Sequence, residues 1–129
     1  MNVLFISKGL PPAVDGVGDY TINIAREFSS HGHSVTIVCK KAEDVITDYA
    51  NITVLPVVEA WNNNNGKRIR QLINERNIDV TMLQYVPHAF EPHGLPFGLL
   101  SFVQQIKKSN KPVFTFLHEV YWRYRGGVI

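Results

Sequence analysis

The segment NVLFISKGLPPAVDGVGDYTINIAREFSSHGHSVTIVC, residues 2–39, contains the unit that decides the fold. Its first residues, Asn2–Ser7, form a short apolar run typical of a buried strand, and a loop rich in glycine and proline follows. Apolar side chains then recur at helical spacing from Asp19 onward, until a glycine ends the pattern. The β-branched run Ser34–Cys39 comes next. The segment therefore predicts a strand, a helix over about 18–30 and a second strand.

The same alternation continues along the rest of the chain. Three further apolar or β-branched runs predict strands, at Ile52–Val58, Ile78–Gln84 and Pro112–Leu117. The patterns between the strands predict a short helix at Lys41–Asp48, a helix that Asn62–Asn65 caps and Asn77 stops, and a helix from Pro96 to Lys108. Pro56 lacks a backbone N–H, which favours an edge position for its strand.

Strands that alternate with helices favour an α/β fold with a mostly parallel sheet and right-handed crossovers. The expected strand order is 3-2-1-4-5, with helices on both faces of an open, Rossmann-like sheet. A chain of 129 residues, 45% of them apolar, is large enough for one such domain and too small for two.

Composition restricts the partners and the compartment. The net charge of +2 comes from basic residues spread along the chain, so no nucleic-acid footprint is predicted. The single cysteine, Cys39, lies in an apolar run and is expected to be a core residue in a reducing, cytoplasmic setting. No apolar run predicts a signal peptide or a membrane-spanning helix. The basic residues of the helix predicted between Asn62–Asn65 and Asn77, together with Arg123 and Arg125, favour a solvated face, or alternatively a weak contact with anionic lipid.

Ligands of open parallel sheets bind beyond the carboxyl ends of the strands, where the strand order reverses. This rule selects three loops: Lys8–Gly18, Tyr85–Gly94 and the segment from His118 onward. Gly16, Val17 and Gly18 open a helix, whose free N–H groups suit a phosphate or a sugar hydroxyl. The spacing is not that of the dinucleotide fingerprint, and glycines needed only for a turn explain it equally well.

Polar side chains gather at the same predicted edge. Asp19 in the first helical turn suits either a cap or an acceptor hydroxyl, because a carboxylate would repel phosphate. His118 follows the last strand and can donate a hydrogen bond to a sugar hydroxyl or serve structurally, and Glu119 comes next. Tyr85 follows the strand predicted at Ile78–Gln84 and suits stacking on a sugar, or a solvated loop. His31 and His33 lack the partners of a metal site, so no metal is predicted.

The opening MNVLFISKGLPPAVDGVGDYTINIAREFSSHGHSVTIVC resembles that of family-4 glycosyltransferases, and DVTMLQYVPHAF and PVFTFLHEVYW resemble the fourth and fifth strands of that family. The resemblance implies that residues 1–129 are the N-terminal, acceptor-side half of a two-domain GT-B enzyme. It places the loop with Gly16 and Gly18 near the donor diphosphate and acceptor, and His118 near the donor sugar as a catalytic residue. Many relatives have adjacent glycines where this chain has Asp15-Gly16-Val17-Gly18.

The resemblance further implies the substrates and the missing part. The donor is a nucleotide sugar, the acceptor a carbohydrate or a lipid-linked molecule, and no cofactor is needed. The C-terminal half, which grips the nucleotide sugar in such enzymes, is absent from this sequence, so the chain alone is expected to be inactive. Two alternatives remain: a stand-alone flavodoxin-like module that binds a nucleotide or phosphate, and a non-catalytic interaction domain.

Overall fold

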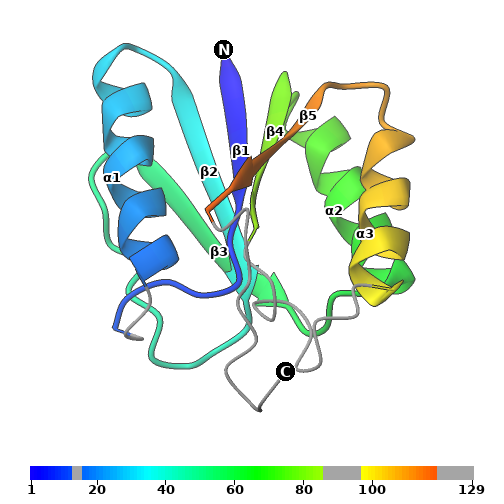
Figure 1. Ribbon diagram of the computed structural model, residues 1–129. Helices are drawn as coiled ribbons and strands as arrows, with labels where there is room; N and C mark the ends of the chain where they lie inside the picture. Colours follow the sequence, from blue (N-terminus) through cyan, green and yellow to red (C-terminus); the bar gives the residue numbers. More distant parts are fainter. Residues whose placement is uncertain (13–15, 86–96, 119–129) are drawn as a thin grey trace, which may run out of the picture.

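The computed structural model describes residues 1–12, 16–85 and 97–118. Figure 1 shows a central sheet with helices packed against it. The strands are β1 (Asn2–Ile6), β2 (Ser34–Lys40), β3 (Ile52–Val58), β4 (Val80–Tyr85) and β5 (Val113–Leu117). The helices are α1 (Gly16–Ser30), α2 (Asn63–Glu75) and α3 (Phe97–Lys107).

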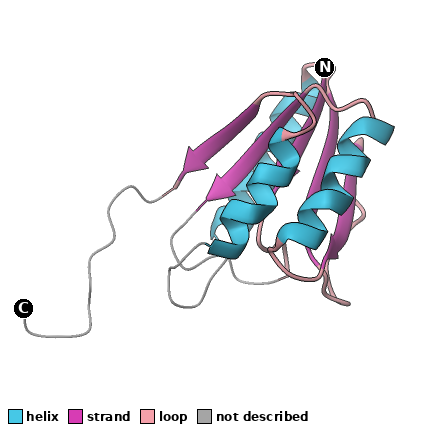
Figure 2. Cartoon of the chain, turned by 90° about the vertical axis from the view of Figure 1, so that its right-hand side faces the viewer, coloured by secondary structure: helices cyan, strands magenta, loops and turns pink. Residues whose placement is uncertain are grey.

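The sheet has the order β3-β2-β1-β4-β5, and every pair of neighbouring strands is parallel. Helix α1 covers one face, and α2 and α3 cover the other (Figure 1). Figure 2 looks onto the second face, where α2 and α3 lie side by side. The expected α/β, Rossmann-like class and its strand order are therefore confirmed. Pro56 lies in β3, an edge strand, as its missing N–H requires.

The central strand β1 supplies buried side chains to both faces of the sheet. Val3 and Phe5 pack in the core beneath α1, whereas Leu4 and Ile6 pack in the core beneath α2 and α3. A strand buried on both faces reads as a continuous apolar run, which is why NVLFI lacks alternation. Cys39 is fully buried in the α1 core, as expected of a thiol that acts as a small hydrophobe.

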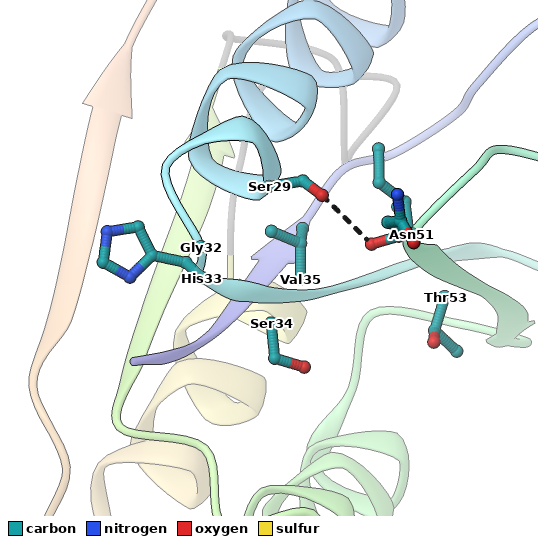
Figure 3. A pocket seen from close by; sticks show the side chains of 8 residues that line it. Ser29, Gly32, His33, Ser34, Val35, Asn51 and Thr53 are labelled. Carbon is teal, nitrogen blue, oxygen red and sulfur yellow. Dashed lines mark hydrogen bonds between the residues drawn. The ribbon is translucent and has the colours of Figure 1, made fainter.

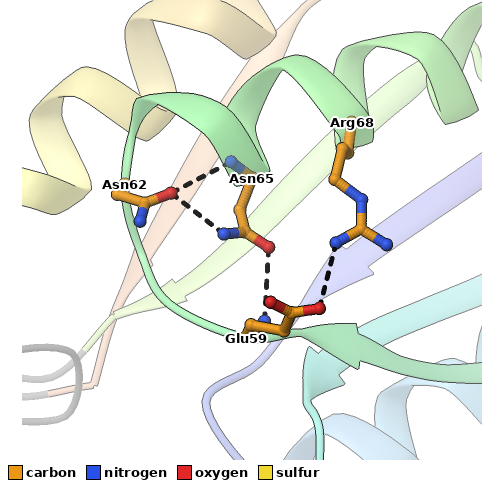
Figure 4. Close-up of polar contacts among 4 residues, drawn as sticks. All are labelled: Glu59, Asn62, Asn65 and Arg68. Atoms are coloured by element: carbon orange, nitrogen blue, oxygen red, sulfur yellow. Dashed lines mark hydrogen bonds and ion pairs between the residues drawn. The ribbon is translucent and has the colours of Figure 1, made fainter.

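The asparagine run fixes the beginning of α2, and Figure 4 shows the contacts. The Asn62 side chain accepts a hydrogen bond from the Asn65 backbone N–H at 3.0 Å. Asn65 is itself buried, and its side-chain oxygen accepts from the Glu59 backbone N–H at 3.2 Å. The exposed ion pair of Arg68 with Glu59 at 3.4 Å adds little. Asn77 follows the end of the helix with φ of 52°, the left-handed stop that the sequence predicts.

One predicted helix is absent, and several boundaries differ from the sequence-based prediction by one or two residues; β4, for example, is Val80–Tyr85 instead of Ile78–Gln84. No helix forms over residues 41–48, because the backbone there bonds to other segments: Lys41 N–H donates to Val58 O at 2.7 Å and Ile46 N–H to Pro11 O at 3.0 Å. Helix α1 begins at Gly16 instead of Gly18, so both glycines lie in its first turn. The proposed opening of α3 by Pro96 lies outside the described residues.

Candidate functional site

The carboxyl end of the sheet is where the strand order reverses, between β1 and β4. The chain leaves β1 through Ser7, which is fully buried. Its backbone N–H donates to Val38 O at 3.1 Å, and its hydroxyl donates to Gly9 O at 2.9 Å. These bonds hold the start of the loop against β2 and set the position of Gly9.

The two glycines of the first α1 turn have different surroundings. A Cβ atom at Gly18 would lie 2.8 Å from the carbonyl oxygen of Gly9, so Gly18 lets the helix pack directly on the loop after β1. Among the described residues, a Cβ atom at Gly16 would meet nothing within 4 Å. Val17 lies between them, and its carbonyl oxygen accepts the Thr21 hydroxyl at 2.7 Å. The helix N-terminus is thus fixed at Gly18 and open at Gly16.

Asp19 lies in the first turn of α1 and is exposed. It lines an open groove of about 430 Å³ together with the apolar residues Pro11 and Ile22 and with Asn23, Arg26 and Tyr49. The Arg26 guanidinium lies over the Tyr49 ring, 5.5 Å from its centroid. A carboxylate, an amide and a cation beside an aromatic ring are groups that hydrogen-bond and stack with sugars. No local sequence pattern indicates this groove, because Tyr49 lies in a segment that only tertiary structure brings to α1.

His118 lies between the ends of β4 and β5 and the second turn of α1. Its Nε2 is 2.6 Å from Oε1 of Gln84, and its backbone N–H donates to Tyr85 O at 3.1 Å. The ring also contacts Tyr20 edge to face, with centroids 4.9 Å apart and an angle of 80° between the planes. The structure therefore connects His118 to the helix that begins at Gly16.

Tyr85 occupies the opposite face of the sheet from this cluster. Its side chain packs against the core beneath α2 and α3, whereas Val80 and Met82 of the same strand pack beneath α1. Because side chains alternate along a strand, Gln84 lies on the α1 side and Tyr85 does not. Glu119, the remaining predicted site residue, lies outside the described residues.

A second hollow, of about 560 Å³, lies at the other end of the sheet (Figure 3). It is lined by Gly32, His33 and Ser34 after α1 and by Asn51 and Thr53 at the start of β3. This is the amino end of the strands, opposite the end where parallel sheets bind ligands. We therefore place the candidate site at the carboxyl end and assign no ligand to this hollow.

Other chemistry-bearing groups do not belong to the site. Burial raises the pKa of the Cys39 thiol to about 11, which makes it a poor nucleophile. Within residues 1–12, 16–85 and 97–118, no group of three potential ligands gathers for a metal ion. In the same part of the chain, no helix has the length and apolar character needed to cross a bilayer.

Comparison with known proteins identifies the family. The model of Glycosyltransferase Family 4 matches residues 14–128, nearly the whole chain. The chain therefore belongs to Glycosyltransferase Family 4. Searches of curated proteins and of solved structures found no match.

Proposed function

We propose that this chain is the N-terminal, acceptor-side domain of a glycosyltransferase, which transfers a sugar from a nucleotide-sugar donor to an acceptor hydroxyl. The observation that supports this most is the convergence of the α1 N-terminus with His118, joined through Tyr20, at the carboxyl end of the sheet. Membership in Glycosyltransferase Family 4 supports the class of reaction.

The N-terminus of α1 provides the electrostatic part of the site. The positive end of the α1 dipole attracts oxygen atoms that bear negative charge. A Cβ atom at Gly16 would meet nothing within 4 Å among the described residues, so a ligand oxygen can approach the backbone at Gly16. We assign Gly16, Val17 and Gly18 to the diphosphate of the donor or to the acceptor that lies beside it.

We assign catalysis and acceptor binding to the side chains around this turn. His118 acts as the catalytic residue next to the donor sugar. Asp19 lies along the open groove and accepts a hydrogen bond from an acceptor hydroxyl, since its charge disfavours a phosphate. Tyr85 and Glu119 stay as proposed binding residues, with Tyr85 reached from the α2 and α3 side of the sheet.

Transfer of a sugar requires neutralisation of the charge that grows on the leaving diphosphate, in a cleft closed to water. The α1 turn and Asp19 form one open wall, because Gly16, Asp19 and Tyr20 are all exposed. We therefore propose that a C-terminal half supplies the opposite wall and that the chain is inactive without it.

The partners follow from the same reaction. The donor is a nucleotide sugar, and the acceptor is a carbohydrate or a lipid-linked molecule in the cytoplasm. For a lipid-linked acceptor, the exposed basic side chains of α2 suit a weak contact with an anionic membrane surface; these are Lys67, Arg68 and, just after the helix, Arg76.

Calorimetric titration of the chain with UDP-glucose and GDP-mannose tests the division between two halves. The proposal predicts weak binding by the chain alone, with a Kd of about 1 mM or higher, because one wall offers few contacts. The native-length protein, which in this proposal includes the C-terminal half, should bind one donor in the micromolar range. Micromolar binding by the chain alone would instead favour a stand-alone nucleotide-binding module.

A double substitution separates the enzyme from an interaction domain. Gly16→Val fills the open space at the α1 N-terminus, and His118→Ala removes the imidazole. We expect the native-length double variant to lose glycosyl transfer while its fold, measured by circular dichroism, is kept. Undiminished biological function of this variant would favour a non-catalytic interaction domain.

A further inference from the structure

Gln84 is a polar residue in a position suited to an apolar one. It lies in β4 on the face that Val80 and Met82 turn toward the α1 core, and it is fully buried. Its neighbour in the register of β5 is Phe116. Burial of a primary amide here is unfavourable unless both ends of the amide find partners.

Only one end of this amide has a partner among the described residues. Oε1 accepts from Nε2 of His118 at 2.6 Å, whereas Nε2 of Gln84 is buried and without a hydrogen bond in the described part of the chain. An apolar residue of similar size would avoid this unpaired donor, so stability does not explain a glutamine at this position. Groups that weaken the fold in this way gather at functional sites.

The contact with Gln84 determines which nitrogen of His118 has the proton. A carbonyl oxygen only accepts, so Nε2 must donate, and in the neutral ring Nδ1 then has the free lone pair. Tyr20 of α1 contacts the same ring edge to face. The orientation of the imidazole is thus fixed from β4 and from α1 together.

We propose that Gln84 is a positioning residue that holds His118 in its Nε2–H form, so that His118 presents Nδ1 as a hydrogen-bond acceptor to a sugar hydroxyl. The role of the hydroxyl rests on the proposed glycosyl transfer, whereas the tautomer and its dependence on Gln84 do not. The sequence leads to the opposite expectation, that His118 donates to the sugar.

Nitrogen-15 NMR of the ring-labelled, native-length protein at about pH 8 tests the tautomer directly. The signals of His118 are assigned by their loss in His118→Ala. The proposal predicts the Nε2–H form alone in the wild type and in Gln84→Glu, whose carboxylate also accepts, and a mixture of both neutral tautomers in Gln84→Met, which cannot accept through oxygen. A predominant Nδ1–H form in the wild type, or an unchanged tautomer in Gln84→Met, would overturn it.

Gln105 provides the matched control, because it is also a buried glutamine but lies in α3, where Asn63 and Arg70 satisfy its side chain at 2.7 and 3.0 Å. Gln105→Met should lower stability and leave the His118 tautomer unchanged. If Gln84→Met does not fold, the wild-type tautomer and Gln84→Glu decide the question.

Kinetics of the native-length protein then test the consequence for transfer. Gln84→Met is expected to lower kcat by ~10²-fold with little change in the acceptor KM, because a misplaced catalytic group acts mainly on the transition state. Gln84→Glu should restore most of the rate. If His118 has the Nε2–H form but the protein has no transfer activity, the proposed function is contradicted, whereas the positioning of His118 by Gln84 is not. An unchanged kcat in Gln84→Met would contradict the positioning role of Gln84.

Discussion

The α-carbon of Gly18 approaches the carbonyl oxygen of Gly9 so closely that a Cβ atom at position 18 would lie 2.8 Å from it. This contact joins the first turn of α1 to the loop that leaves β1. Since that loop is itself held by Ser7, the approach fixes where the helix N-terminus stands at the carboxyl end of the sheet. Gly18 therefore helps to position the N-terminus of α1 at the candidate site.

Gly18→Ala is expected to destabilise the chain by about 1–3 kcal/mol, because the new methyl group meets backbone that cannot move away cheaply. Urea unfolding followed by circular dichroism measures the change. Gly16→Ala is the matched control, since a Cβ there meets nothing within 4 Å in the described part of the chain and should change stability by less than about 0.5 kcal/mol. Equal stabilities for the two variants would contradict the packing described for Gly18.

Asn62→Ala should lower the free energy of unfolding by about 1 kcal/mol, through loss of the cap on α2. Asn64→Ala changes an exposed asparagine two residues later, inside the helix, and should be neutral or slightly stabilising because alanine favours helix. Thermal unfolding of both variants gives the comparison. A larger loss for Asn64→Ala would show that the asparagine run acts in another way.

Cys39 predicts a specific dependence of stability on alkaline pH. Its pKa is about 11 in the folded chain against 9.0 for an unburied thiol. Above about pH 9 the unfolded chain loses this proton while the folded chain keeps it, so the contribution is complete below pH 9 and is lost as the pH rises toward 11. Urea unfolding between pH 8 and about 11 should show a steeper decline for the wild type than for Cys39→Ala. Parallel declines would contradict the burial of the thiol.

Asp19→Ala tests the assignment of the open groove to the acceptor. Loss of a hydrogen bond to a charged group corresponds to roughly a tenfold to hundredfold rise in the acceptor KM of the native-length protein. The donor KM should stay the same. Glu27→Ala, an exposed acid near the other end of α1, should change neither constant. A rise confined to the donor KM would move Asp19 to the donor side.

Much of the fold follows from the sequence, because apolar runs and helical spacing mark each long element and right-handed crossovers restrict their order. The prediction of a helix at residues 41–48 was wrong, because no local sequence pattern indicates the hydrogen bonds of this segment to Pro11 and Val58. A small error at the start of α1 has the same origin: the position of Gly18 depends on Gly9, which folds back from the preceding loop.

The candidate site was predictable in part. The rule for parallel sheets selects the edge where α1 begins and His118 lies. The alternation of side chains along β4 separates Tyr85 from Gln84, and this could have been read from their adjacent positions. The hydrogen bond between Gln84 and His118 joins residues 34 positions apart, and no local pattern reports it.

Release of nucleoside diphosphate from a panel of nucleotide sugars by the native-length protein tests the proposed sugar transfer directly. We expect release from at least one donor, stimulated by an acceptor and lowered by ~10²-fold or more in His118→Ala. Release that is unaffected by His118→Ala would remove His118 from the reaction. Absence of release from every donor, by a protein that is folded and of native length, would contradict the account.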